Sequence, residues 1–269
     1  MPWKLMAMPT IPEPSFVDFD AGQPGRQPAG ANDFCVEWFA FGNPAQAIQI
    51  EASSEHLVVV GRGTLRIVPA SVAEEVAVPV NHIAIVPAGT HTLLGEPGTQ
   101  GAVITTRRAG LESQPPYGRR QQLAMPQVLS FDQIKASPEK PRLKMLQTAT
   151  VSINIVEYHG PRDRSALSPH SHAAFEQGSL AIEGNFVHHL RMPWGSDAGQ
   201  WRDDEHKAAP SPSLVVIPPH VIHTTEGVGE GRHLLVDVFS PPREDFIASG
   251  WVFNAADYQP TGAAAQGDG

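Results

Sequence analysis

The sequence predicts an all-β protein in which two small β-barrels follow one another along the chain. Short apolar runs rich in Val, Ile, Thr and aromatic residues recur from about residue 34 onward, with turn residues between them. Gly (24 residues) and Pro (26 residues) are abundant between these runs, which favours short strands over long helices. The series of runs also occurs twice. Because a series of short antiparallel strands leaves unpaired edges, we expect each copy to close into a barrel or jelly roll.

The predicted elements follow in order along the chain. Residues 1–33 are rich in Pro, Gly and Ala and are expected to form an arm over the surface. Residues 34–107 contain the first series of strands, and the polar, Pro-containing residues 108–145 are typical of a linker between domains. Residues 146–258 contain the second series, and the low-complexity tail at 259–269 is expected to be disordered. The expected strands read CVEWFAF, AQAIQIEA, HLVVV, TLRIV, HIAIVP and GAVITT, then VSINIVEY, QGSLAIEG, FVHHLRM, SLVVIPP and HLLVDVFS.

Two matching segments indicate a diverged internal repeat. The first copy contains EHLVVVGRG and the second EQGSLAIEG, and each copy then reaches an apolar strand that ends in Pro and His. The second copy is longer between these marks, and its extra length falls in the polar stretch from Met192 to Pro212, which contains Trp194 and Trp201. We expect this loop to border the mouth of a functional pocket and to help enclose substrate. A neutral surface insertion is the alternative, because loops tolerate changes of length at small cost.

A cluster of metal-ligand residues is the sharpest signal in the second copy. His170, His172 and Glu176 are separated by even numbers of positions, so that in a pleated strand their side chains would project from one face. His223, at the end of a later strand, can supply a fourth ligand. Imidazole and carboxylate together suit Zn, Fe, Mn, Co or Ni. The sequence therefore predicts one divalent transition metal per chain.

This pattern resembles the two signature motifs of the cupin superfamily, well over about residues 150–240 and as a degenerate copy in the first half. The resemblance implies a three-His, one-Glu metal site inside a small β-barrel, formed here by His170, His172, Glu176 and His223. Some expected residues differ: charged sequence replaces the Gly before the first His, the Pro-x-Gly turn reads Pro-Pro-His, and the Asn after the last His is absent.

The first copy lacks this ligand set. Aligning Glu55 with Glu176 places Gln49 and Glu51 where the first two histidines lie in the second copy. With Glu55 and His91, these residues would offer one nitrogen among oxygens, a poor match to His-rich transition-metal sites. We expect a scaffold barrel without metal. A metal-free ligand pocket and a weak, oxygen-rich metal site remain open alternatives.

Other polar residues are candidates for supporting roles. His188 and His189 are adjacent on one predicted strand, so only one of them can face the barrel interior, where it could act as a general base. Arginines could bind a substrate carboxylate. The candidate catalytic residues are His188, His189 and Arg191, and the weaker candidates are Arg162, Arg232, His206 and His220.

Composition narrows the partners. The formal net charge is −9 and no block of Lys or Arg occurs, so nucleic acid is not an expected partner. No apolar run is long enough to span a membrane, and the single cysteine, Cys35, fits a reducing cytoplasm. The expected partner is a small-molecule substrate, with a homodimer left open.

A second resemblance concerns the end of the second copy. The stretch HLLVDVFSPPREDFI is similar to the end of the cupins that open unsaturated uronates to linear keto acids during pectin and alginate breakdown. Those proteins are single barrels, and they have Gln where this chain has Glu176, with one more residue in the spacing. The resemblance implies an isomerase or lyase.

Three functions remain open at this point. The first is a metal-dependent isomerase or lyase that enolises or opens a small oxygenated acid. The second is an Fe(II)-dependent dioxygenase that cleaves an aromatic or diketone substrate, and the third is a non-enzymatic protein that binds or senses a small molecule. All three use the same fold, which does not by itself choose between them.

Overall fold

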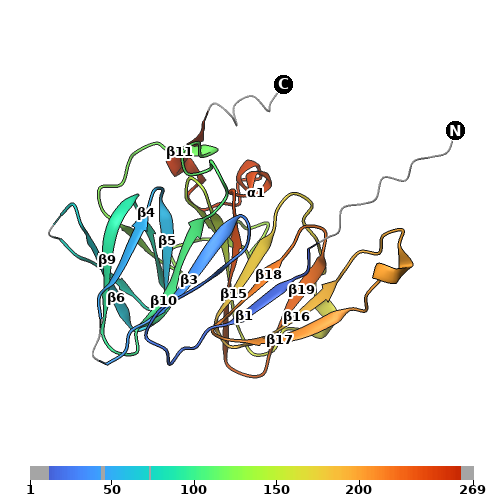
Figure 1. Cartoon of the computed structure of the whole chain (residues 1–269). Coiled ribbons are helices and arrows are strands. Elements are labelled where there is room, and N and C mark those ends of the chain that lie inside the picture. The colour runs from blue at the N-terminus through green and yellow to red at the C-terminus, as the bar shows by residue number, and fades with distance from the viewer. Residues whose placement is uncertain (1–11, 44–45, 73, 262–269) are drawn as a thin grey trace.

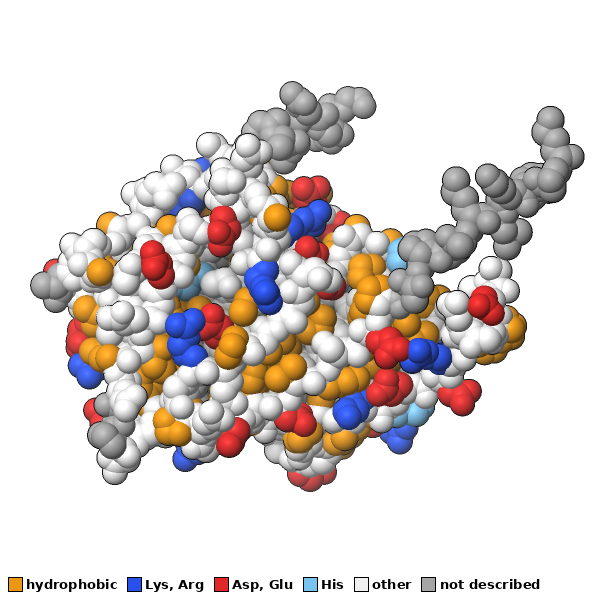
Figure 2. All heavy atoms as spheres, viewed as in Figure 1, with side chains coloured by type: hydrophobic (Ala, Val, Ile, Leu, Met, Phe, Trp, Pro, Cys, Tyr) orange, Lys and Arg blue, Asp and Glu red, His pale blue; other side chains and the backbone are white. Residues whose placement is uncertain are grey.

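The computed structural model describes residues 12–43, 46–72 and 74–261, and it confirms the all-β class. Two strand-rich halves lie side by side (Figure 1), each built from two facing sheets. On the face shown in Figure 2, basic side chains are interspersed with acidic ones. Among the described residues, no helix is long and apolar enough to cross a membrane.

The N-terminal half consists of a six-stranded sheet, in the order β12-β8-β5-β10-β3-β2, and a four-stranded sheet, in the order β4-β9-β6-β7. All strand pairs in both sheets are antiparallel. Their bounds are β2 Gly25–Gly30, β3 Phe34–Ala40, β4 Ile48–Ala52, β5 His56–Arg62, β6 Thr64–Pro69, β7 Val76–Pro79, β8 His82–Val86, β9 Gly89–Gly95, β10 Gln100–Thr106 and β12 Gln127–Ser130.

The C-terminal half repeats this plan with a six-stranded sheet, β1-β18-β15-β20-β14-β13, and a three-stranded sheet, β17-β16-β19. The bounds are β1 Ser15–Asp18, β13 Lys144–Gln147, β14 Ser152–His159, β15 Gln177–Glu183, β16 Asn185–Arg191, β17 Glu205–Pro210, β18 Ser213–Ile217, β19 Ile222–Val228 and β20 Arg232–Phe239. A short helix α1, Glu244–Ala248, follows, and β21, Tyr258–Pro260, pairs with β11, Tyr117–Arg119.

The segments expected to form an arm, a linker and a tail contain paired strands. Within the expected arm 1–33, β1 pairs with β18 of the other half, so the blue strand in Figure 1 lies among the late strands, and β2 pairs with β3. Within the expected linker 108–145, β12 joins the N-terminal sheet and β13 the C-terminal sheet. These segments cover sheet edges that would otherwise expose unpaired backbone groups. Of the tail 259–269, residues 259 and 260 belong to β21, and residues 262–269 lie outside the described residues.

The largest hydrophobic cluster lies between the two six-stranded sheets and contains side chains from both halves, such as Phe34 and Trp38 on one side and Leu180 and Val236 on the other. A Cβ atom added to Gly178 would lie 2.7 Å from the ring of Phe34, so the two sheets approach too closely there for a larger residue. A second cluster fills the N-terminal barrel. The C-terminal barrel has smaller apolar clusters, which leaves room for a polar site inside it.

Candidate metal centre

Three of the four predicted ligands come together inside the C-terminal barrel. The ligand nitrogens of His170, His172 and His223 all lie within 4.8 Å of one another. His170 and His223 form an isolated antiparallel bridge, with backbone hydrogen bonds of 3.0 and 2.8 Å between them. This bridge fixes the segment before β15 against β19. The backbone itself thus holds together two candidate ligands from distant parts of the sequence.

Hydrogen bonds to the backbone orient two of these rings. The Nδ1 atom of His170 lies 3.0 Å from the carbonyl oxygen of Ser168, and that of His223 lies 2.9 Å from the carbonyl oxygen of Val221. Since a carbonyl oxygen can only accept, Nδ1 carries the proton in each neutral ring and Nε2 keeps its lone pair. Each ring therefore presents Nε2 to the centre of the cluster, as metal-binding histidines do.

Gln177 lies next to two of the three histidines. Its Oε1 atom lies 3.0 Å from Nε2 of His172 and 3.3 Å from Nε2 of His223, while its Nε2 atom donates to Ser179 and to Asp237. These two donated bonds fix the amide with its oxygen toward the histidines. Two ligand atoms that each lie about 2.1 Å from one ion, at a right angle, are separated by about 3.0 Å. The spacing of the oxygen and the nitrogens thus suits adjacent ligands of one metal ion.

Glu176 does not join the cluster. Its carboxylate accepts hydrogen bonds from the backbone N–H of Asp33 and from the side chain of Asn32, in the segment that leads into β3. The alternation of faces holds only within a strand, and β15 begins at Gln177, so the irregular residues before it do not follow the rule. In the structure it is the neighbouring Gln177, and not Glu176, whose side chain lies beside the histidines.

The donor set fits a divalent transition metal. Burial, as the largest effect, lowers the pKa of His172 to about 3 and that of His223 to about 4, so both rings are neutral near pH 7, which is the form that binds metal. Three imidazole nitrogens and one amide oxygen are donors of the kind used by Zn, Fe, Mn, Co and Ni. An ion held by these four groups would keep further positions for a substrate.

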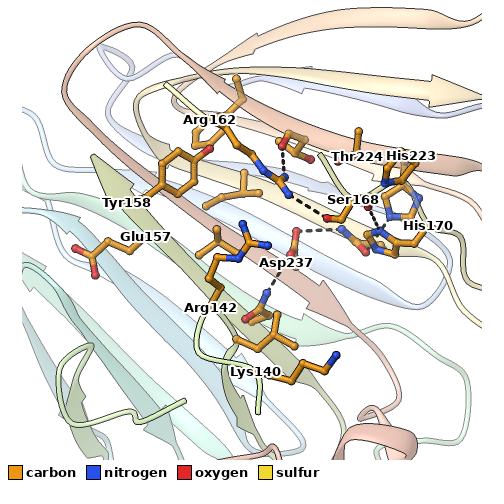
Figure 3. Close-up of a pocket in the computed structure, with 18 of the residues that line it drawn as sticks. Lys140, Arg142, Glu157, Tyr158, Arg162, Ser168, His170, His223, Thr224 and Asp237 are labelled. Atoms are coloured by element: carbon orange, nitrogen blue, oxygen red, sulfur yellow. Dashed lines mark hydrogen bonds between the residues drawn. The ribbon is translucent and has the colours of Figure 1, made fainter. Parts of the chain in front are cut away.

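The cluster opens into a pocket of about 860 Å³. Figure 3 shows His170 and His223 on one side of this pocket and Tyr158 and Arg162 on another, with Asp237 between the histidines and Arg142. The volume is near the upper end of the usual range for small-molecule sites, about 300–1,000 Å³. The histidine cluster is therefore accessible to a molecule well beyond the size of water.

Asp237, on β20, is a half-buried carboxylate beside the cluster. Ser179 donates to its Oδ1 atom at 2.8 Å and Gln177 donates to the same atom at 3.0 Å, while Asn154 donates to Oδ2 at 3.4 Å. Burial raises the pKa of Asp237, and these three donors oppose that rise. Asp237 is thus a titratable group that reaches the histidine cluster through a single intervening side chain, that of Gln177.

Arg243 is the buried cation of the pocket. Its Nε and Nη2 atoms donate to the carboxylate of Asp245 at 2.8 and 2.6 Å, and its guanidinium carbon lies 3.8 Å from the ring centre of Phe246 and 4.6 Å from that of Phe175. Within the described chain, its Nη1 atom has no hydrogen-bond acceptor. The rings and Asp245 therefore hold the group in place and leave one edge for an anionic ligand.

The three predicted catalytic residues lie outside this pocket. His188 faces inward, is fully buried, and has its Nδ1 atom 3.1 Å from Oγ1 of Thr225, but it does not line the pocket. His189 faces the other side of the sheet, as adjacent strand residues must. Arg191 forms a bidentate ion pair with Asp204 at the surface.

The weaker candidates separate in the same way. His189 contacts His206 at 2.8 Å and Glu226 at 2.9 Å on the outer face of β16, beside a second pocket of about 540 Å³. Arg232 pairs with Glu157 and Glu183, and the exposed His220 donates its backbone N–H to His172. Arg162 alone among these candidates lines the larger pocket.

The inserted loop from Met192 to Pro212 lies elsewhere. It contains β17, which extends the three-stranded sheet, and its Trp194 and Trp201 rings stack on each other with centroids 4.5 Å apart. Both rings are exposed, and no residue of the loop is among those that line the larger pocket. Its expected place at the pocket mouth is not what the structure shows.

In the first copy, the four residues aligned with the ligands do not converge. Ile50 lies opposite His91 in the sheet, as His170 lies opposite His223, so the buried Ile50 takes the place of the first histidine. Gln49 and Glu51 are one position out of register and are exposed. Glu55 accepts a hydrogen bond from the hydroxyl of Tyr258 at 2.8 Å. Apolar side chains fill this barrel where the second copy has its polar site.

The sequence reasoning missed Gln177, Asp237 and Arg243 as site residues. All three were visible in motifs quoted for other reasons: Gln177 follows Glu176 directly, and the other two lie in HLLVDVFSPPREDFI. The resemblance of that stretch to the uronate-opening cupins, with Gln one residue later than Glu176, was the signal that could have found them.

Comparisons with known proteins address the fold. No protein-family model matches the sequence, and no curated protein matches it significantly. AerE from Microcystis aeruginosa is similar over 82% of this chain and 99% of its own, at 10% identity and a TM-score of 0.53. A deletion mutant of the oxalate decarboxylase OxdC from Bacillus subtilis is similar over 81% of this chain and 74% of its own, at 10% identity and a TM-score of 0.52.

Procruciferin, an 11S globulin from Brassica napus, is also similar, over 77% of this chain and 76% of its own, at 10% identity and a TM-score of 0.50. At this identity the likenesses show a shared fold, the cupin-type β-barrel. Since the neighbours include both a decarboxylase and a globulin, the fold does not select an activity.

Proposed function

We propose that this chain is a metal-dependent isomerase or lyase that acts on a small sugar acid, by opening the ring of an unsaturated uronate to a linear keto acid. The observation that carries the proposal is the contact between Gln177 and Asp237. It joins the cluster of four candidate ligands to a half-buried carboxyl group that can exchange a proton. Proton transfer beside a metal is the chemistry of enolisation and ring opening.

The resemblance at the end of the chain supports the same substrate class. The uronate-opening cupins have Gln as the fourth ligand residue, one position later than Glu176, and Gln177 occupies that position here. The stretch HLLVDVFSPPREDFI supplies Asp237 and Arg243, which both line the pocket. The spacing that differed between this chain and those cupins is thereby accounted for.

The residues would divide the work as follows. His170, His172, Gln177 and His223 would hold the metal, which when bound supplies a Lewis acid that polarises a substrate oxygen. Arg243 would orient the substrate carboxylate through its free Nη1 edge. Asp237 would take the proton of the ring hydroxyl as the ring C–O bond breaks, and would return a proton to the carbon of the resulting enol.

An assay with an unsaturated galacturonate tests this proposal. The metal-loaded protein should consume the ring double bond, seen as a loss of ultraviolet absorbance, at the same rate with and without dioxygen. Asp237→Asn should lower kcat by at least about a hundredfold, in line with the usual contribution of general acid–base catalysis. Asp132→Asn, an exposed carboxylate outside the pocket, is the matched control.

The two other functions make different predictions for the same assay. A dioxygenase would require dioxygen and consume it, and the three-His, one-Glu set that favoured this function is not the set that converges here. A binding protein would show affinity for the acid without turnover. Either result would contradict the proposed isomerase or lyase activity.

A further inference from the structure

A pair of histidines lies on the outer face of the three-stranded sheet β17-β16-β19 (Figure 1). His189 on β16 is directly opposite His206 on β17, and the Nδ1 atoms of the two rings are 2.8 Å apart. His189 is also opposite Thr224 on β19, so His223, the next residue, projects from the inner face of the sheet toward the central cluster. The sheet therefore separates this pair from the site already described.

Glu226 determines which nitrogen of His189 carries the proton. Its Oε2 atom lies 2.9 Å from Nε2 of His189, and its Oε1 atom lies 3.4 Å from Nε of Arg164. Because a carboxylate only accepts, Nε2 of the neutral His189 ring carries the proton, and Nδ1 keeps a lone pair that points at His206. A carboxylate that accepts from the far nitrogen of an imidazole in this way is the usual partner of a metal-binding histidine.

A metal ion can take the place of the proton between the two rings. Since Nδ1 of His189 accepts, Nδ1 of His206 must donate when no ion is bound. Two nitrogens that each lie about 2.1 Å from one ion, at a right angle, are about 3.0 Å apart, so the rings need to move little to hold an ion. The displaced proton can transfer through water to Nε2 of His206, because that side chain is exposed.

The surroundings leave room for the rest of a coordination shell. Both rings line a pocket of about 540 Å³, and the side chain of His189 is 18% exposed, so an ion can reach the pair from solvent. Water can occupy the positions that the two imidazoles leave open. Nitrogen ligands at a right angle, with oxygen in the other positions, suit the square geometry of Cu²⁺ and Ni²⁺, and Cu²⁺ binds such sites more tightly.

We propose that His189 and His206 form a second metal site, for Cu²⁺, on the outer face of the C-terminal barrel. Both imidazoles bind the ion through Nδ1, and Glu226 orients the His189 ring and makes it a stronger ligand. None of these three residues lines the larger pocket, so the inference is independent of the proposed function.

Titration of the full, untagged chain with Cu²⁺ tests this site. Isothermal titration calorimetry in a buffer that contains glycine, a weak competitor, counts the equivalents bound, and electron paramagnetic resonance reports their nitrogen ligands. His206→Gln should bind one equivalent fewer than the unmodified protein, whatever the central cluster binds. Glu226→Gln should keep this equivalent but bind it about tenfold more weakly, because the neutral amide no longer strengthens His189 as a ligand.

His82→Gln is the matched control, because His82 lies on β8 of the other barrel and its ring contacts the carbonyl oxygen of Val80. It should bind Cu²⁺ as the unmodified protein does. Equal binding by His206→Gln and the unmodified protein would overturn the proposal, as would the loss of an equivalent in His82→Gln. An unchanged affinity in Glu226→Gln would overturn the orienting role of the carboxylate. Since His206 is exposed, His206→Gln should keep its unfolding midpoint, which shows that a lost equivalent does not come from misfolding.

Discussion

Gln177 and Glu176 are neighbours at the start of β15, and their side chains point in opposite directions. Replacing each of them in turn should therefore have different effects on metal affinity. Gln177→Leu removes the oxygen that lies 3.0 Å from His172 and 3.3 Å from His223. Loss of one of four ligands should weaken metal binding at least tenfold, about 1.4 kcal/mol. It also removes one of three donors to the half-buried Asp237, which should lower the free energy of unfolding of the apo protein by about 1 kcal/mol.

Glu176→Gln should leave metal affinity within about twofold. The amide keeps an oxygen for the backbone N–H of Asp33 and loses only the charge on that bond, which should lower the free energy of unfolding by about 1 kcal/mol. Competition with a chelator measures the affinity, and urea unfolding of the apo protein measures stability. If Glu176→Gln released the metal while Gln177→Leu kept it, the ligand assignment made from the structure would be refuted.

Three further predictions concern other parts of the chain. Burial lowers the pKa of His56 to about 4, so the folded state binds fewer protons there than the unfolded state and loses stability as the pH falls from about 6.5 toward 4. Between pH 7 and 5 this loss of stability amounts to about 2 kcal/mol. Urea unfolding of His56→Gln should therefore depend less steeply on pH than that of the unmodified protein, and an equal dependence would contradict the prediction. Trp194→Ala should change steady-state turnover by less than about twofold, because the ring lies outside the pocket; a tenfold loss would restore the expected role of the loop. Gly178→Ala should destabilise the protein by about 1–3 kcal/mol, because its Cβ would meet the Phe34 ring. The control Gly195→Ala should have little effect, because the space around Gly195 is open. Equal unfolding midpoints for the two variants would argue against close packing of the two halves.

Local patterns were sufficient to predict the strands and the repeat. Apolar runs of β-forming residues and the turns between them are properties of short segments, so they can be read without knowing which strands pair. The convergence of His170, His172 and His223 was also accessible, because the His-x-His pair and the later His belong to short motifs that can be recognised in the sequence.

The remaining site residues depend on facts that no short segment contains. Parity predicts a shared face only inside a strand, and β15 begins one residue after Glu176, so the rule does not apply to Glu176, whose carboxylate faces Asp33. The same shift of one position misplaced Gln49 relative to Ile50 in the first copy. Asp237 reaches the cluster because it lies opposite Ser179 in the sheet, a register that only strand pairing sets.

The two glutamates that revealed the repeat have a consequence for how the protein unfolds. Glu176 of the second copy accepts from Asp33, just before β3 of the other half, and Glu55 of the first copy accepts from Tyr258, just after the last helical turn of the second. Each half therefore carries a buried acceptor whose donor belongs to the opposite end of the chain. Separation of the halves would leave both carboxylates without their donors and would expose the apolar faces of both six-stranded sheets to water. The chain should thus melt in one transition, and neither half should survive as an independent fragment.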